Sequence, residues 1–300
     1  MLQLLLGGSG SGKTTLLYQR IRARAEKGEK SILLVPEQFT SSTEGRIYRE
    51  LGDALSGRVE SFSFTSLAEK ILSTEGGAAV QTLSDAGRAV LVRRALEELQ
   101  DNVHYYHRHR RSAAFCQMAA QTIDELKSAG LSGQQLAQLA GACGAESGKL
   151  SELALIFQGY ETLLARSGMD PSDRLELAGA RLEEALARHS LPEFLRDRAV
   201  FIDEFDTFNA PKKRLLGAML AALPSVTVAL CDDGAPLLPG DLSLFSGAKQ
   251  VAAQLRQLAR KNGAEVAVPQ LLRKDLRHRN APGLAAVAEL LETGSCTADA

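Results

Sequence analysis

The sequence predicts an α/β protein in which a parallel sheet flanked by helices is interrupted by an all-helical insertion. Short, largely apolar runs, typical of buried parallel strands, occur in the first part of the chain and again from residue 199 onward, for example at residues 2–6 and 199–202. Amphipathic helical patterns alternate with these runs. Between them, from about residue 83 to residue 189, nearly every segment has helical periodicity and is rich in Ala, Leu, Glu, Arg and Gln.

In the first part of the chain, apolar runs and helical patterns alternate. We expect strands at residues 2–6, 31–35 and 59–64, and helices at residues 14–27, 43–55 and 66–72. In the insertion we expect helices at residues 84–99, 113–129, 132–140, 149–166 and 171–188, separated at glycines. The α/β pattern then returns, with strands at residues 199–202, 226–231 and 265–268 and helices at residues 212–223, 249–262 and 284–291. The expected domains are residues 1–75, 76–192 and 193–300.

Composition limits the possible classes of protein. The chain has 300 residues, of which 45% are hydrophobic, so it suits a soluble protein of one or two domains. A net charge of −1 gives no general attraction to nucleic acid or membrane, so any DNA contact must come from a local patch. Four scattered cysteines without a C-x-x-C pair argue against a zinc site and favour a reducing cytoplasm. No apolar segment is long enough to predict a membrane span, so we expect no membrane partner.

A glycine-rich loop follows the first strand. Residues 7–14 read Gly-Gly-Ser-Gly-Ser-Gly-Lys-Thr and match the phosphate-loop pattern G-x-x-x-x-G-K-[ST]. Glycines let backbone N–H groups converge on phosphate oxygens, and the helix that follows adds positive potential. A chance Gly/Ser turn before a helix is the alternative, but Lys13 fits the β- and γ-phosphates and Thr14 fits Mg²⁺. The residues expected to bind ATP are Gly7, Gly8, Ser9, Gly10, Ser11, Gly12, Lys13, Thr14 and Thr15.

An acidic pair follows the apolar run at residues 199–202 and resembles a Walker B element. Ligands bind at the carboxyl ends of strands in open α/β sheets, which is where Asp203 and Glu204 are expected. We expect Asp203 to bind Mg²⁺ and Glu204 to orient or deprotonate the attacking water, so that Lys13, Asp203 and Glu204 are the catalytic residues. A solvated strand end is the alternative. A second pair, Asp232-Asp233, fits either a sensor of the γ-phosphate or a loop before Gly234.

The order of these motifs resembles the AddB family, which supplies one of the two chains of bacterial AddAB helicase/deoxyribonucleases. The segments that carry the resemblance are the glycine loop, residues 34–40 (LVPEQFT), 61–67 (SFSFTSL), 83–85 (LSD), 125–127 (ELK) and 201–205 (FIDEF). The resemblance implies a RecA-like P-loop NTPase domain. A helical insertion inside such a domain is similar to the arrangement in superfamily 1 helicases.

The resemblance implies that the chain is the N-terminal motor-like part of an ATP-dependent helicase/exodeoxyribonuclease subunit. Such subunits resect double-strand DNA breaks for recombinational repair, and the implied partners are DNA and an AddA-type subunit. The family's second RecA-like domain, and a C-terminal nuclease with a four-cysteine 4Fe-4S site, are not visible here. We therefore expect an N-terminal fragment, in which no arginine finger comes from this chain. Family members often have Asp-Gly-Phe at Asp203-Glu204-Phe205, so Glu204 restores a hydrolytic pattern.

Three segments are candidates for DNA contact. Gln38, Phe39 and Thr40 occupy a loop that resembles helicase motif Ia, although Thr40 or Ser41 could simply cap the helix that follows. The basic and aromatic segment at residues 104–111 contains Arg108, Arg110 and Arg111, and a solvated interhelical loop is the favoured alternative for it. Ser63 and Thr65 follow the third strand, where polar residues are common.

Two functions from other classes remain open. A P-loop phosphotransferase, such as a nucleotide or small-molecule kinase, would share the glycine loop, but it needs a compact arginine-bearing lid that the sequence does not indicate. A non-hydrolysing scaffold that uses ATP only to brace a complex is the other alternative.

Overall fold

The computed structural model describes residues 1–109, 111–144 and 147–293, which divide into two compact units. The sheet unit comprises Met1–Leu67, Leu182–Phe208 and the described residues from Leu216 onward, and the helical unit comprises Ala68–Arg181 and Asn209–Leu215. Arg110 and Cys296 lie outside the described residues. The domain boundaries expected after residues 75 and 192 stay predictions.

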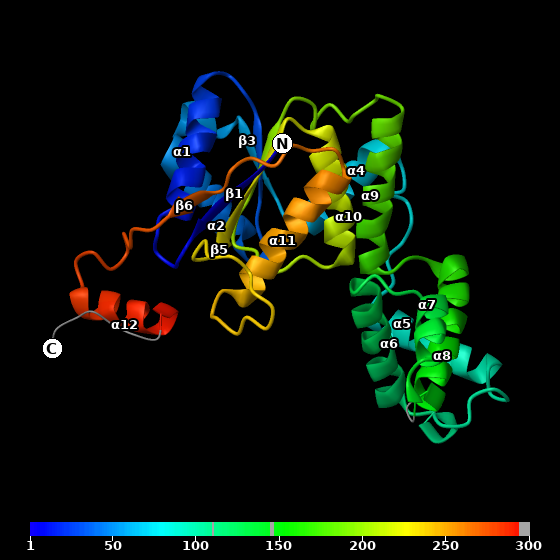
Figure 1. The fold of residues 1–300 in the computed structure, drawn as a ribbon. Coiled ribbons are helices and arrows are strands. Elements are labelled where there is room, and N and C mark those ends of the chain that lie inside the picture. The colour runs from blue at the N-terminus through cyan, green and yellow to red at the C-terminus, as the bar shows by residue number, and fades with distance from the viewer. Residues whose placement is uncertain (110, 145–146, 294–300) are drawn as a thin grey trace. The chain divides into compact units, whose positions relative to one another are not determined.

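Parallel strands form the sheet of the sheet unit, in the order β3-β2-β4-β5-β1-β6. Figure 1 labels β1, β3, β5 and β6 among them. The strands are β1 (Leu2–Gly7), β2 (Ser31–Leu34), β3 (Val59–Phe62), β4 (Ala199–Ile202), β5 (Ser225–Cys231) and β6 (Gln270–Leu272). Every residue of β2 and β4 is buried. Central parallel strands are covered on both faces, which is why they require continuous apolar sequence. The predicted α/β class with a helix-flanked parallel sheet is confirmed.

Helices α1 and α2 pack on the sheet through apolar side chains. The helices and 3₁₀ turn that lie wholly in this unit are α1 (Lys13–Glu26), η1 (Glu37–Phe39), α2 (Thr40–Leu51), α3 (Asp53–Ser56), α11 (Ser246–Lys261) and α12 (Pro282–Thr293). Leu17 and Ile21 of α1 and Ile47 of α2 share one buried cluster with Leu33 and Phe201 from the central strands. The predicted helix at residues 43–55 is two helices, since α2 ends before Gly52 and α3 follows it.

One predicted strand is displaced. Residues 265–268 were expected to form a strand, but only Val266 makes an isolated bridge, to Leu2, and the strand β6 lies further on at Gln270–Leu272. Pro269 stands between the bridge and β6. Since proline has no backbone N–H to donate, the pairing with β1 is interrupted there and resumes one residue later.

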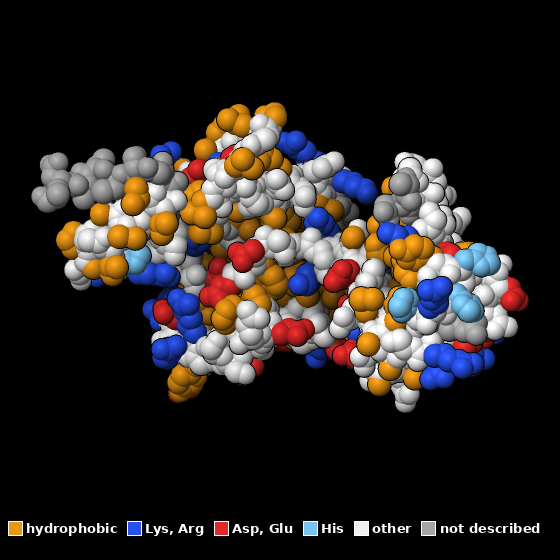
Figure 2. Space-filling view, turned by 90° about the horizontal axis from the view of Figure 1, so that it is seen from below, with side chains coloured by type: hydrophobic (Ala, Val, Ile, Leu, Met, Phe, Trp, Pro, Cys, Tyr) orange, Lys and Arg blue, Asp and Glu red, His pale blue; other side chains and the backbone are white. Residues whose placement is uncertain are grey.

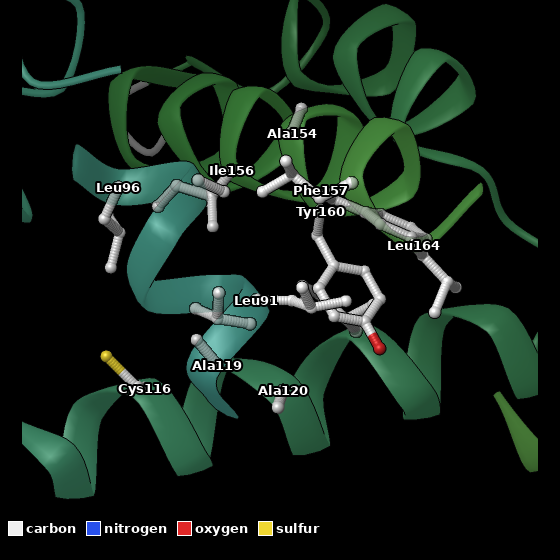
Figure 3. Close-up of a cluster of buried hydrophobic side chains, with 14 of the residues drawn as sticks. Leu91, Leu96, Cys116, Ala119, Ala120, Ala154, Ile156, Phe157, Tyr160 and Leu164 are labelled. Carbon is white, nitrogen blue, oxygen red and sulfur yellow. The ribbon is translucent and has the colours of Figure 1, made fainter. Parts of the chain in front are cut away.

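The helical unit has its own apolar core (Figure 3). Its helices are α5 (Asp85–Glu98), α6 (Ala113–Ser128), α7 (Gly133–Ala140) and α8 (Ser147–Ser167), with a 3₁₀ turn η2 (His107–His109). Phe157 and Tyr160 of α8 are buried with Leu91 of α5 and Ala120 of α6. Helices α4 (Phe64–Glu75), α9 (Pro171–Ala187) and α10 (Ala210–Ala222) have residues in both units. The helical character predicted for this region is observed in the structure.

A buried ionic cluster joins the helices of this unit. The Lys127 ammonium lies 2.7 Å from Oδ2 of Asp170 and 2.8 Å from Oδ2 of Asp173. The Tyr160 hydroxyl donates to Oδ1 of Asp170 at 2.6 Å. Asp170 is almost fully buried, so its charge depends on these partners. Lys127, which belongs to one of the segments resembling the AddB family, therefore has a structural role here.

Among the described residues, none of the helices is both long and apolar enough to cross a membrane.

Candidate nucleotide site at the carboxyl edge of the sheet

The glycine-rich loop connects β1 to α1. Gly10 and Gly12 have φ angles of +79° and +89°, a left-handed backbone that residues with a Cβ rarely adopt. Gly12 directly precedes the 14-residue helix α1. The loop therefore ends at a helix N-terminus, where backbone N–H groups and the helix dipole favour a bound anion.

Lys13 is held across this loop. Its Nζ donates to the carbonyl oxygens of Gly7, at 2.7 Å, and Gly8, at 2.8 Å. Ser11 is buried so close to Gly7 that a Cβ on Gly7 would lie 2.4 Å from the Ser11 hydroxyl oxygen, which explains the need for glycine there. Among the described residues, no hydrogen-bond partner for that hydroxyl is found. The loop thus combines a cation with a buried polar atom whose hydrogen-bonding capacity is unused.

Asp203 follows β4 and points to the start of α1. It is buried, and its backbone N–H donates to the Leu34 carbonyl at 3.1 Å, which continues the pairing of β4 with β2. Burial raises the pKa of its carboxyl, while a hydrogen bond with the Thr14 side chain and the charge of Lys13 act in the opposite direction. The hydroxyl and the carboxylate expected to bind Mg²⁺ are therefore neighbours.

Glu204 has a backbone conformation that is unusual for its residue type. Its φ angle is +64°, in the left-handed region, and its N–H donates to Oδ1 of Asp203 at 3.0 Å. The pKa of its carboxyl is raised by burial and by the charge of Asp203, and is lowered in part by Arg46. Backbone strain concentrates at functional sites, so the strain at Glu204 is consistent with a functional role for its side chain.

These side chains line one cavity. The cavity has a volume of about 480 Å³ and is lined by Lys13, Thr14, Asp203 and Glu204, which were predicted from separate motifs. That volume is in the range of small-molecule sites. Four further predicted residues also line it: Ser9, Gly10, Gly12 and Thr15. Gly8 and Ser11 line an adjoining cavity of about 430 Å³, and Gly7 is the last residue of β1.

Two arginines in the cavity wall were not predicted from the sequence. Arg277 follows β6, and its Nη1 donates to the Ser9 hydroxyl at 3.1 Å, while the N–H of Leu276 donates to the Gly10 carbonyl at 3.0 Å. Arg46 comes from α2. The basic run RKDLRHR directly after an apolar run could have drawn attention to Arg277, whereas no sequence pattern distinguishes Arg46. The tertiary fold thus brings two arginines of this chain to the cavity, while the expectation that no arginine finger comes from it stays a prediction.

The loop expected to contact DNA forms η1 and the start of α2. Gln38 is exposed, whereas Phe39 is half-buried against the apolar cluster of the sheet unit. Thr40 is the first residue of α2, and its hydroxyl donates to the Glu37 carbonyl at 3.0 Å. The capping alternative is wrong for Thr40 and Ser41, since the cap position is Phe39 and has no side-chain cap hydrogen bond. The DNA contact itself stays a prediction.

Ser63 caps α4. The N–H of Ser66 donates to the Ser63 hydroxyl at 3.1 Å, and the N–H of Ser63 donates to the Ser66 hydroxyl at 2.8 Å. Ser63 is buried and Thr65 is exposed. The geometry therefore accounts for Ser63 as a structural residue and leaves Thr65 accessible to a ligand.

The basic and aromatic segment of the helical unit is fixed by a carboxylate. The Glu152 side chain accepts backbone hydrogen bonds from His104, Tyr105 and Tyr106, each between 2.8 and 3.1 Å. Arg108 and Arg111 are exposed, and Arg110 lies outside the described residues. Figure 2 shows histidine and basic side chains gathered over this unit.

The second acidic pair is not part of the cavity that contains Lys13 and Glu204. Asp232 is buried and accepts a hydrogen bond from the Gly234 N–H at 2.7 Å, and Asp233 lies 3.3 Å from the Lys249 ammonium. Both acids line the adjoining cavity. This arrangement favours the loop alternative over a sensor of the γ-phosphate.

The fold and the cavity define a parallel-sheet α/β protein with a candidate site at the carboxyl ends of its strands. The family model described as "ADDB, N-terminal" matches residues 4–288. The chain belongs to the AddB family.

Curated relatives agree with this assignment. The chain is 34% identical, over 95% of its length, to the B-type subunit of the ATP-dependent helicase/deoxyribonuclease of Desulforudis audaxviator, and it covers 25% of that protein. It is 33% identical over 95% of its length to the protein of the same name from Moorella thermoacetica, again covering 25% of it. The corresponding protein of Clostridium perfringens strain 13 is 29% identical over 93% of the chain. The chain thus spans about a quarter of the length of these relatives.

Proposed function

We propose that this chain is the ATP-binding, RecA-like motor part of a helicase–nuclease subunit, with its helical unit inserted as in superfamily 1 helicases. The observation that carries the proposal is the single cavity lined by Lys13, Thr14, Asp203 and Glu204. A glycine loop at a helix N-terminus binds phosphate, and an acidic pair at the end of a nearby strand supports metal-dependent phosphate chemistry. Membership of the AddB family favours this function over a phosphotransferase.

ATP and Mg²⁺ fit the groups at this site. In the proposal, backbone N–H groups of the glycine loop and Lys13 hold the phosphates, and Thr14 and Asp203 hold the metal. Magnesium prefers hard oxygen ligands, and the Thr14 hydroxyl and Asp203 carboxyl are already hydrogen-bond partners. The unused hydroxyl of Ser11 adds a polar group to the loop that a ligand or water can satisfy. Bound Mg²⁺ would neutralise charge on the phosphates.

Glu204 is the proposed base that orients or deprotonates the attacking water. Its partly exposed side chain extends from the same strand end as Asp203, into the same cavity. Arg277 and Arg46 add positive charge to the wall, which helps to balance the phosphates and the two acids. A complete active site resembling that of the helicases would also use residues from a second motor domain.

DNA and a partner subunit enter the proposal through the relatives. Since those relatives are named helicase/deoxyribonuclease subunits, we propose that this chain acts in the cytoplasm with an AddA-type subunit in resecting DNA ends for recombinational repair. Gln38, Phe39, Thr65, Arg108 and Arg111 are the proposed DNA contacts. The nuclease and its 4Fe-4S cluster would belong to the remainder of a full-length subunit.

The test is DNA-stimulated ATP hydrolysis by the full-length subunit in complex with its AddA-type partner. We expect Glu204→Gln to retain ATP binding and to reduce this subunit's own share of the hydrolysis by at least about 100-fold, as for loss of a general base. To isolate that share, the phosphate-loop lysine of the partner subunit is replaced, so that the remaining hydrolysis is that of this subunit alone. If turnover of this isolated share is unchanged in Glu204→Gln, the hydrolytic role is refuted and the scaffold alternative is favoured.

A further inference from the structure

Arg46 lies in the wall of the nucleotide cavity, although it belongs to none of the sequence motifs. It is half-buried on α2 and lines the cavity together with Lys13, Asp203 and Glu204. Its guanidinium carbon lies 4.9 Å from the centre of the Tyr18 ring. An arginine stacked on an aromatic ring loses much of its rotational freedom, so its N–H groups are presented in a defined direction.

Tyr18 locates this guanidinium relative to the predicted magnesium ligands. Tyr18 follows Thr14 by four residues in α1, so the two side chains lie on the same helix face, slightly more than one turn or about 6 Å apart along the axis. Burial raises the pKa of the Tyr18 hydroxyl to about 12; the charges of Asp203 and Glu204 add to this rise and that of Arg46 opposes it. The stacked arginine therefore lies beside a residue about one helical turn from Thr14, and it lines the same cavity as Thr14 and both acids.

The charge balance of the cavity gives this arginine a role when nucleotide is bound. The terminal phosphate of ATP would add negative charge to a cavity that is already lined by Asp203 and Glu204. The Lys13 ammonium already donates hydrogen bonds to the carbonyl oxygens of Gly7 and Gly8. A guanidinium presents several donors in one plane and suits phosphate better than a single ammonium does. Arg46 is placed to supply these donors.

The position of Arg46 along α2 connects the cavity to the candidate DNA loop. Helix α2 begins at Thr40, directly after η1, and Arg46 lies fewer than two helical turns further on. A hydrogen-bonded helix moves as one element. A ligand that displaces Phe39 or Thr40 would therefore also displace Arg46 relative to Tyr18 on α1.

We propose that Arg46 contacts the terminal phosphate of bound ATP and couples nucleotide binding to single-stranded DNA at the η1–α2 loop. The inference rests on the proposed function, because it requires ATP in the cavity and DNA at the loop. Coupling between two binding sites is reciprocal, so each ligand must change the affinity for the other by the same factor. The proposal can therefore be tested by measuring binding affinities, without an activity assay.

The experiment measures dissociation constants of Mg·ATP and Mg·ADP by titration calorimetry, with and without a saturating oligo-dT strand. Four proteins are compared: wild type, Arg46→Gln, Arg46→Lys and Arg49→Gln. Arg49 lies on the same helix, is exposed, and donates to the Gly45 carbonyl, so it is the matched control for charge on α2. Thermal melting and Mg·ADP affinity report whether each variant is folded.

We expect the wild type to bind ATP more tightly than ADP, and oligo-dT to change its ATP affinity. Arg46→Gln should lose about 10-fold or more in ATP affinity, as expected for a hydrogen bond to a charged group, and should lose the effect of oligo-dT while ADP affinity stays unchanged. Arg46→Lys should retain part of the ATP affinity and part of the effect of oligo-dT. Arg49→Gln should retain the wild-type ATP affinity and the full effect of oligo-dT. The proposal is overturned if Arg46→Gln keeps the preference for ATP and the effect of DNA, or if DNA has no effect on ATP binding by the wild type. A wild type that binds neither nucleotide would instead refute the proposed function.

Discussion

Replacing Glu204 by glycine separates the contribution of this residue to stability from its proposed contribution to hydrolysis. The φ angle of +64° places a residue with a Cβ in the left-handed region, which costs roughly 1–2 kcal/mol. Glycine adopts this backbone without steric strain but loses about 0.5–1 kcal/mol more conformational entropy on folding. The backbone difference alone should therefore favour glycine over alanine at this position by about 0.5–1 kcal/mol.

A second contribution comes from the side chain. The pKa of the Glu204 carboxyl is raised by burial and by Asp203, so its ionised form destabilises the folded state at neutral pH. Glu204→Ala removes this carboxylate but keeps the Cβ and its backbone strain. Glu204→Gly removes both. We expect the free energy of unfolding to increase from wild type to Ala to Gly, with the melting temperature of the Gly variant higher than that of the Ala variant by about 1–3 °C.

Urea denaturation and thermal melting, both followed by circular dichroism, measure the wild type and the two variants at pH 7. The same proteins, tested for hydrolysis in the full-length complex, should have lost the share of turnover assigned to Glu204. If Glu204→Gly is less stable than Glu204→Ala, the left-handed backbone is not a source of strain and the reasoning fails.

Further predictions concern Asp203 and the buried cluster of the helical unit. The folded-state pKa of Asp203 is raised above its unfolded value, so its ionisation destabilises the fold above that pKa, and this cost disappears as the pH falls through the two values. Asp203→Asn should therefore be more stable than wild type at pH 7, and urea denaturation should find this gain reduced near pH 4. Lys127→Ala leaves Asp170 buried beside Asp173 without its cation, so it should destabilise the helical unit by about 3–5 kcal/mol, whereas a double variant with Asp170→Asn should recover part of the loss. Retention of wild-type stability by Lys127→Ala in the same assay would show that the ion pair is unimportant.

The sequence predicted those parts of the fold that local pattern determines. Residues 199–202 are a continuous apolar run and residues 2–6 are apolar except for the half-buried Gln3, because strands buried on both faces tolerate few polar residues, and the structure has strands at both places. The strand expected at residues 265–268 was misplaced for a local reason, since the effect of Pro269 on pairing with β1 depends on which strand is the neighbour.

The site was predictable only where a motif carries the chemistry in consecutive residues. The glycine loop and the pair Asp203-Glu204 are such motifs, and most of their residues line one cavity. Arg46 could not be identified, because its role depends on stacking against Tyr18 of another helix. The left-handed backbone of Glu204 was also hidden, because no local sequence pattern predicts a positive φ for a glutamate after an apolar strand.

The most direct test of the account is equilibrium binding of ATP to this chain by titration calorimetry, in the presence and absence of Mg²⁺. The account predicts one site per chain, with tighter binding when Mg²⁺ is present. It also predicts that replacing Lys13 by alanine weakens binding by at least about 10-fold, as expected for loss of a charged hydrogen bond. Absence of ATP binding by the folded wild type, or equal binding by folded Lys13→Ala, would contradict the assignment of this cavity as a nucleotide site.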